Sequence, residues 1–464
     1  LKHKDDWQQF TSPLSKEELK KKDPSMRGLL KEENLKSISY SGKLILSYNK
    51  YLSEKLFMTS MGGTNIESNS EDKAAYESIG FFSDKLTHPS FASRYPLSGT
   101  PTGGDLIDRS VGFFANANMI YDNKYFLDLI YRYEGSSKFG KNKRFAPFWS
   151  VGSGWNIHHE KFMQHVDVQT LKLRASVGYL GNVSFSPYQS RTTYIYGAEL
   201  NYLQGIGAIP ITIGNPDLKW ERTLNSNIGL DLTMFKNRWD LVVDIYYKNT
   251  DNLLLDVTKA PSIGVSLARE NIGKIENKGV EVQTRVVPIT TKDWHWALSL
   301  NYSYNKNKIK SISDALRIKN EKNIQSKENI MPRPIYEEGE SLTALKVVPS
   351  AGIDPATGKE IFIKRNGEYS FTYDAHDKVV FGDMTPFAFG KLSSYLTYKN
   401  FSMNMMFDYS LGGLIYNETL VTRVEGSDPR YNADERVFND RWKNPGDRAK
   451  YKDIANQEIP LHTS

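Results

Sequence analysis

A chain of 464 residues without a single cysteine has no disulfide framework, no cysteine-ligated metal and no lipidated cysteine within this sequence. A net charge of +6 is small for this length and is scattered through polar segments, so it does not indicate a nucleic-acid-binding protein. The mean hydropathy of −0.53, with no apolar run of about 18 residues, excludes a helical membrane protein.

Segments in which apolar and polar residues alternate recur along the chain. In the segment 169–180, for example, Leu171, Leu173 and Val177 alternate with Lys172 and Arg174. Side chains of a strand point alternately to opposite sides, so such a segment has one apolar face and one polar face. In chain order, this pattern predicts antiparallel strands at about 42–49, 55–62, 111–121, 125–134, 145–156, 169–180, 222–234, 239–250, 278–287, 293–305, 386–398 and 401–411.

The last predicted strand shows the pattern most clearly. It reads FSMNMMFDYSL, with Met403, Met405 and Phe407 on one face and Asp408 on the other. An arginine or lysine on the apolar face would cost roughly 2–4 kcal/mol at the middle of a bilayer, and the clearest strands carry none there. Tyrosine and tryptophan recur at the strand ends. The sequence therefore predicts an all-β fold, an antiparallel transmembrane β-barrel.

The predicted connections are short on one side and long on the other. The short turns are 51–54, 122–124, 235–238, 289–293 and 399–400, and the long connections are about 63–110, 134–144, 181–221, 251–277, 306–385 and 412–464. In outer-membrane barrels the short turns face the periplasm and the long loops face outside. The long connections are therefore predicted to be extracellular.

The N-terminal segment 1–34 is predicted to lie outside the sheet. It is dense in lysine and glutamate and has little apolar periodicity, which is typical of a solvated loop or a fraying terminus. On this interpretation the first strand edge lies before about residue 42 and the last lies after about residue 411.

Two groups of residues invite a metal interpretation, and neither has the required pattern. The connection 157–166 is predicted to form a single helical turn, and adjacent His158 and His159 point apart. In the 306–385 connection the aspartates lack the dense oxygen spacing of a calcium loop, and the segment 354–358 is better explained as a tight turn between two short strands. No metal and no cofactor are predicted; the residues concerned are His158, His159, His165, Asp354, Asp374 and Asp377.

Four stretches, in order and at the expected spacing, resemble one protein family. They are 129–163 (LIYRYEGSSKFGKNKRFAPFWSVGSGWNIHHEKFM), 214–232 (GNPDLKWERTLNSNIGLDL), 271–283 (NIGKIENKGVEVQ) and 338–362 (EGESLTALKVVPSAGIDPATGKEIF). The chain resembles the SusC/RagA-like family, the TonB-linked outer-membrane transporters of Bacteroidota. The resemblance implies part of a barrel of about 22 strands whose lumen holds a plug domain. No plug-like sequence is seen in this chain.

The resemblance implies a function and a set of partners. Such barrels lie in the outer membrane among lipid and lipopolysaccharide and are capped by a SusD-like surface lipoprotein. They import oligosaccharides or peptides, using energy that TonB delivers through the plug. No catalytic motif is found, so an enzyme is not expected. The alternatives are a SusC-like structural subunit of an outer-membrane assembly complex, without transport, and a soluble all-β glycan-binding protein or hydrolase.

Charged residues on the polar faces of the strands are the candidates for the barrel lumen. They would brace a plug, wet the lumen or contact substrate. These candidates are Asp128, Arg132, Lys172, Arg174, Asp240, Asp244, Glu281, Arg285 and Asp408.

The sequence also predicts that this barrel is incomplete on its own. Neither a signal peptide nor a plug is recognised, and the residues 461–464 fall in an expected loop. An unpaired strand edge in lipid leaves backbone groups unsatisfied at several kcal/mol each, so both edges are expected to pair with further strands.

Overall fold

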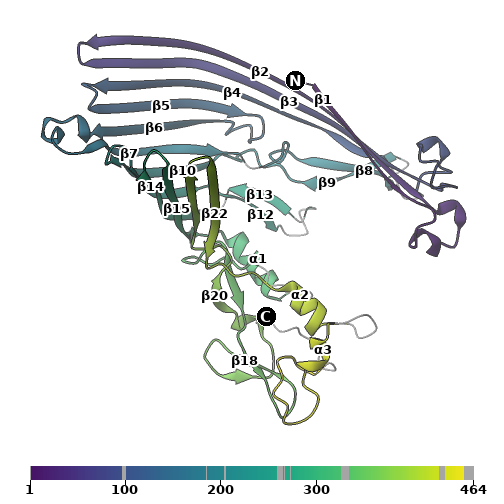
Figure 1. The fold of residues 1–464 in the computed structure, drawn as a ribbon. Coiled ribbons are helices and arrows are strands. Elements are labelled where there is room, and N and C mark those ends of the chain that lie inside the picture. The colour runs from purple at the N-terminus through teal and green to yellow at the C-terminus, as the bar shows by residue number, and fades with distance from the viewer. Residues whose placement is uncertain are drawn as a thin grey trace.

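The computed structural model describes residues 2–96, 101–183, 185–202, 205–258, 265, 267–271, 273–325, 334–427 and 434–453. Within these residues one curved antiparallel sheet of 13 strands dominates the molecule (Figure 1). Its strand order follows the chain: β1 (Lys2–Thr11), β2 (Leu29–Ser53), β3 (Leu56–Ile79), β4 (Thr102–Tyr121), β5 (Tyr125–Ser136), β6 (Phe145–Asn156), β7 (Val168–Asn182), β10 (Glu221–Met234), β11 (Trp239–Asp251), β14 (Lys274–Thr290), β15 (Trp294–Ser311), β21 (Ala388–Tyr398) and β22 (Phe401–Leu411).

All twelve strands expected from the alternating pattern are present in this sheet and pair as antiparallel neighbours. The short turns are tight; in the β4–β5 turn, Asp122 and Asn123 both have positive φ, at 50° and 54°. Such turns match the right-handed twist of the flanking strands, and Asn and Asp tolerate them. The turns and the long excursions leave from opposite ends of the sheet (Figure 1).

The prediction that the N-terminal segment 1–34 lies outside the sheet was wrong. Residues 2–11 form β1, which pairs with β2 from Lys2↔Ile38 to Thr11↔Leu29, and β2 begins at Leu29. The sequence KHKDDWQQFT gave no signal because charged residues occupy both faces, and most of this strand is exposed. Backbone pairing, not burial of one face, holds β1 in the sheet.

The predicted 63–110 connection is also shorter than expected. β3 continues to Ile79 and β4 starts at Thr102, with pairs from Leu56↔Tyr121 to Ala75↔Thr102. The added lengths are polar on both sides, as in Asn69–Asp72, so no apolar alternation marks them. Only residues 80–101 remain as the connection, of which 97–100 lie outside the described residues.

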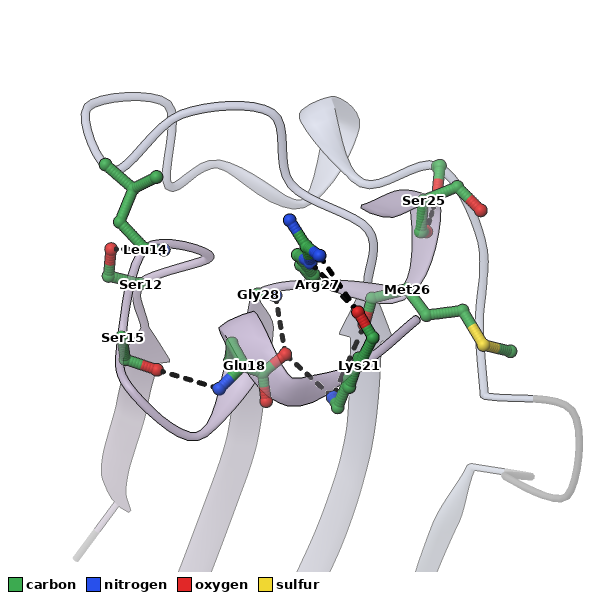
Figure 2. A network of polar contacts seen from close by, with 10 residues as sticks. Ser12, Leu14, Ser15, Glu18, Lys21, Ser25, Met26, Arg27 and Gly28 are labelled. Carbon is green, nitrogen blue, oxygen red and sulfur yellow. Dashed lines mark hydrogen bonds and ion pairs between the residues drawn. The ribbon is translucent and has the colours of Figure 1, made fainter. Parts of the chain in front are cut away.

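The β1–β2 loop, residues 12–28, is closed by a buried carboxylate. Glu18 accepts a 2.7 Å contact from the Lys21 ammonium and a 2.8 Å hydrogen bond from the Gly28 amide (Figure 2). Gly28 has a φ of +81°, and a Cβ there would lie 3.0 Å from Phe81 Cβ. Phe81 in turn meets Phe10 edge-on at 5.1 Å between ring centres. These contacts fasten the loop to the segment after β3.

The long connections contain small excursions from the sheet. Three of them are strand pairs: β8 (Thr193–Tyr202) with β9 (Gly205–Thr212), β12 (Leu254–Thr258) with β13 (Leu267–Asn271), and β16 (Ala344–Val347) with β20 (Val379–Asp383). A three-stranded sheet is formed by β17 (Ser350–Ile353), β18 (Glu360–Ile363) and β19 (Tyr369–Ser370). The helices are α1 (Asp314–Gln325), α2 (Glu418–Leu420) and α3 (Arg436–Asn439). The predicted tight turn at 354–358 is confirmed, since it joins the paired strands β17 and β18. Helix α1 was not predicted.

The connections on either side of β21 and β22 share a buried charged cluster. The Arg441 guanidinium donates to the carbonyls of Val437, Val424 and Glu425 at 2.7–3.0 Å. Burial raises the pKa of Glu360, on β18, to about 8. The Trp442 indole also donates to the Pro355 carbonyl at 2.9 Å, so the chain after β22 is tied to the turn between β17 and β18. The segment 454–464, including the predicted final loop residues, lies outside the described residues.

The helices are short. In the described part of the chain, none combines the length and the apolar character that crossing a membrane requires.

Candidate functional site

Cross-strand pairing assigns every residue of the sheet to one of two faces. The face that carries Arg174 is called the polar face, and the face that carries Leu173 is called the apolar face. One register row runs Arg174↔Gly229↔Asp244↔Glu281 across four strands. Followed through all the pairs, the register places all nine candidates on the polar face: Asp128, Arg132, Lys172, Arg174, Asp240, Asp244, Glu281, Arg285 and Asp408.

The apolar face is uncharged between two levels of aromatic residues. The row Trp155↔Leu173↔Leu230↔Val243↔Val282 is apolar throughout. At the turn end, Trp155 stacks on Tyr125 at 6.2 Å between ring centres, and Trp294 lies 4.2 Å from Tyr398. At the excursion end, Trp149 meets Tyr179 at 5.8 Å. Two aromatic levels around an apolar band are typical of a membrane-spanning barrel wall.

An ion-pair network lies at the centre of the polar face. The Arg174 guanidinium contacts Asp231 Oδ1 at 2.8 Å and Asp244 Oδ2 at 3.2 Å. Its Nε also donates to Asp231 Oδ1 at 3.1 Å. The three side chains are about one-third exposed or less, at 32%, 26% and 23%. One cation thus bridges carboxylates on β10 and β11, and it partly offsets the cross-strand repulsion between Asp244 and Glu281.

Gly229 makes this network geometrically feasible. It stands between Arg174 and Asp244 in the register row, and a Cβ there would lie 2.7 Å from the guanidinium and 2.6 Å from Asp244 Oδ1. The missing side chain lets Arg174 reach across β10 to β11. A side chain at this position would force the ion pair apart.

Six other candidates have local partners on the same face. Arg285 lies 3.6 Å from Asp240, which also accepts a 3.0 Å hydrogen bond from the Thr233 hydroxyl. Asp408 lies 3.5 Å from Lys391 across β21 and β22. The other contacts are Arg132 with Glu134 at 2.7 Å, Asp128 with the Asn118 amide, and the Lys172 ammonium over the Phe126 ring at 4.3 Å.

Sequence reasoning missed three of these partners. Asp231, Lys391 and Glu134 are charged, lie on the polar face and complete ion pairs with candidates. Their position in the alternating pattern was a usable signal, because each lies an even number of residues from another polar residue of its strand and therefore shares that residue's face. What the pattern could not supply was the register that brings charges on different strands together.

The turn end of the sheet has its own polar anchor. Glu160 lies in the connection between β6 and β7, where two 3-10 turns (Ile157–His159 and Lys161–Met163) replace the single helical turn expected. Its carboxylate accepts from the Tyr125 hydroxyl at 2.8 Å, the Lys124 ammonium at 3.2 Å and the Trp155 indole at 3.2 Å. The Tyr125 hydrogen bond, followed by that of Lys124, holds the Glu160 pKa below its ordinary value.

The histidines and aspartates considered as metal ligands serve local structure. His158 and His159 contact backbone carbonyls of Leu171 and Asn123 at 3.1 and 2.8 Å. Asp354 accepts hydrogen bonds from its own turn, and Asp374 caps the turn at Ala375–Asp377. Among the described residues, no three His, Cys, Asp or Glu side chains gather closely enough to hold a metal ion.

Chemically, the polar face is a wall of paired charges and amides. Each ion pair joins two opposite charges and is partly exposed, which suits a surface that borders water or a second polar domain.

Comparison with known proteins agrees with this geometry. The family described as TonB dependent receptor-like, beta-barrel matches residues 35–417. TonB-dependent receptor P39 of Formosa agariphila is 28% identical over 455 residues, which cover 89% of this chain and 43% of that protein. TonB-dependent receptor SusC of Bacteroides thetaiotaomicron is 30% identical over 334 residues, which cover 68% of this chain and 32% of that protein. The chain therefore spans less than half the length of these relatives.

Solved structures are similar over nearly the whole chain. The structure of the RagAB peptide transporter superposes with a TM-score of 0.81 at 26% identity, covering 92% of this chain and 47% of that chain. The RagAB peptide importer in its open-open state gives 0.81 at 25% identity, covering 94% and 47%. With the apolar band, the aromatic levels and the family match taken together, the chain belongs to the TonB-dependent receptor-like β-barrel family and is an outer-membrane protein of the SusC/RagA type.

Proposed function

We propose that this chain forms part of the barrel wall of a TonB-dependent importer. The importer carries oligosaccharides or peptides across the outer membrane together with a SusD-like surface lipoprotein. The observation that carries the proposal is the charged polar face, which spans the same height at which the opposite face is apolar. Charges at that depth are tolerated where they border water or protein and not lipid. They therefore indicate a wide, polar interior.

The nine candidate residues are proposed to line that interior. Because Arg174, Asp244, Asp240 and Arg285 are held in ion pairs, their first role is to brace the wall and wet its surface. Substrate is expected to meet the exposed members, such as Asp408, whose side chain is 77% exposed. Peptides and oligosaccharides both offer the hydrogen-bonding groups that such a wall can accept.

The excursions are proposed to be extracellular and to contact the lipoprotein lid. Support comes from their position at the end of the sheet opposite the tight turns and from the similarity to the RagAB peptide transporter. TonB would act on the whole protein through a plug domain.

The sheet edges are proposed to pair with further strands. In the described residues β22 has one neighbour, and so does the part of β2 after Ile38, because β1 pairs only with residues 29–38; each therefore presents an unpaired row of amides and carbonyls. A lipid environment does not tolerate such a row.

The test uses the whole protein in its native host. An affinity tag should recover a surface lipoprotein and bound solute, and deletion of the gene or of TonB should abolish uptake of labelled oligosaccharides or peptides. The two substrate classes are assayed separately. If uptake persists while assembly of other outer-membrane proteins fails, the structural-subunit role is correct and the import proposal is wrong.

A further inference from the structure

The apolar face carries a cluster of cations at the excursion ends of β10, β11, β14 and β15. The register places Lys278 beside Tyr247 and Lys306, and Lys308 beside Glu276, all on this face. Arg222 and Lys274 follow in the row Arg222↔Asp251↔Lys274. We call the following residues the cationic rim: Arg222, Lys274, Lys278, Lys306, Lys308 and Lys310.

The cationic rim has an excess of positive charge. Lys278 and Lys310 lie 3.0 and 2.9 Å from the buried Glu276 carboxylate, and Lys274 lies 3.3 Å from Asp251. Among the described ion pairs, three of the six cations are thus paired with two carboxylates. The lysine side chains remain available, since those of Lys278 and Lys274 are 61% and 56% exposed.

An apolar groove lies directly next to the cationic rim on the same face. Its volume is about 660 Å³, and Lys278 itself forms part of its wall. Ala175 and Ser226 keep the groove open, and Ile228, Ile245 and Val280 line it. The Lys278 ammonium lies 5.3 Å from the Tyr247 ring, which also lines the groove. The groove thus ends at a cation.

This combination distinguishes one sector of the wall. At the same end of β5 and β6, the apolar face carries the pairs Tyr133↔Pro147 and Gly135↔Phe145, which have no charge. If the cations served only to anchor the sheet at the membrane surface, both sectors would be expected to carry them. Cations that border an apolar groove match a ligand with anionic groups at its head and hydrocarbon chains below.

We propose that the cationic rim and the groove form a binding site for a phosphorylated lipid of the outer leaflet, namely lipopolysaccharide. Its lipid A phosphate would contact Lys278, Lys306 and Lys308, and an acyl chain would occupy the groove beside Ile228 and Val280. The site rests on the proposed orientation, in which the excursions face outside, because only then does the rim lie at the leaflet that contains lipopolysaccharide.

The test compares two matched variants of the whole protein. The first is the triple variant Lys278→Gln, Lys306→Gln and Lys308→Gln. The control is Lys248→Gln, since Lys248 is the chain neighbour of Tyr247 at the same height but on the polar face. Lipopolysaccharide that remains bound after detergent purification is measured by mass spectrometry, and folding is checked by heat-modifiable migration.

We expect the triple variant to retain at least about tenfold less lipopolysaccharide than the native protein, because each lysine adds to the attraction for the phosphorylated head group. The control should retain the native amount. A second variant, Ala175→Phe, fills the groove without altering charge and should also reduce retention. Unchanged retention in both the triple variant and Ala175→Phe would overturn the site.

Vesicles separate the lipid sources. The native protein, reconstituted into vesicles that mix lipopolysaccharide with phosphatidylglycerol and phosphatidylcholine, should retain lipopolysaccharide in preference to the other two lipids when it is extracted again, and the triple variant should lose this preference. Equal binding to phosphatidylglycerol would refute the assignment to lipopolysaccharide. Uptake is measured in parallel: lost lipid retention with normal uptake leaves the importer proposal intact, and lost uptake with normal retention refutes that proposal alone.

Discussion

At the residue scale, the two faces of each strand differ in what they tolerate. Leu230 lies on the apolar face and Asn227 on the polar face, three residues apart in β10. We expect Leu230→Arg to destabilise the barrel by roughly 2–4 kcal/mol, because the guanidinium would lie in hydrocarbon, and Met405→Arg to act similarly. Asn227→Arg and Ser402→Arg should be tolerated. Barrel assembly, measured by heat-modifiable migration, should separate the pairs; equal losses would contradict the assigned faces.

A second prediction concerns pH and Glu160. Its pKa is lowered from the ordinary 4.5, so the charged form is favoured in the folded protein. Hydrogen bonding to Glu160 therefore adds stability above about pH 4.5, and that stability is lost as the pH falls through the lowered pKa. Glu160→Gln should unfold at a lower temperature at neutral pH, and the two proteins should converge once the pH falls below the lowered pKa of Glu160. A difference in unfolding temperature that does not change with pH would contradict this role.

Gly229 offers a test of the polar-face network. Gly229→Ala should displace the Arg174 guanidinium and the Asp244 carboxylate, which are the ends of flexible side chains, and weaken their ion pair at a cost of at most about 1 kcal/mol. The matched control is Gly104→Ala in β4, where a Cβ would meet nothing within 4 Å. Denaturant unfolding of both variants measures the contrast. An equal effect of the two substitutions would show that the ion pair does not depend on the glycine.

At the element scale, the β1–β2 loop should be sensitive to a single substitution. Gly28 has a positive φ, which costs an alanine roughly 1–2 kcal/mol, and its Cβ would press on Phe81 and Pro13. Gly28→Ala should therefore speed hydrogen exchange in residues 12–30 while leaving β10 and β11 protected. Uniformly faster exchange through the sheet would indicate that the loop is not a separate unit.

The elements differ in how far the sequence predicts them. The strands β10 and β11 were predicted within one residue at each end, because one face of each meets an apolar environment and the alternation is strict. β1 and the outer half of β3 were missed because both of their faces are polar, so backbone pairing leaves no trace in hydropathy. The sequence has a similar limit for the site. Alternation within each strand predicted that Arg174 and Asp244 share a face, but only the pairing register between strands shows that they are in contact.

At the scale of the whole molecule, the proposed orientation in the membrane can be tested at the two ends of the sheet. A protease site inserted near Lys322, in α1, should be cleaved on intact cells, whereas one at Asn237, in the β10–β11 turn, should not. Immunoblotting of whole cells and of lysed cells supplies the measurement. Cleavage at Asn237 alone would invert the orientation and would also remove the basis for a lipopolysaccharide site.

The serial strand order has a consequence for how such a protein changes over time. The excursions between two strands of the sheet begin and end where those strands are already paired, as at Asn182↔Glu221 for β8 and β9 and at Asp251↔Lys274 for β12 and β13. Closing a loop between two fixed neighbours costs only about 0.6 kcal/mol more for each doubling of its length. Excursions can therefore be lengthened, shortened or exchanged during evolution with little effect on the stability of the membrane-spanning sheet.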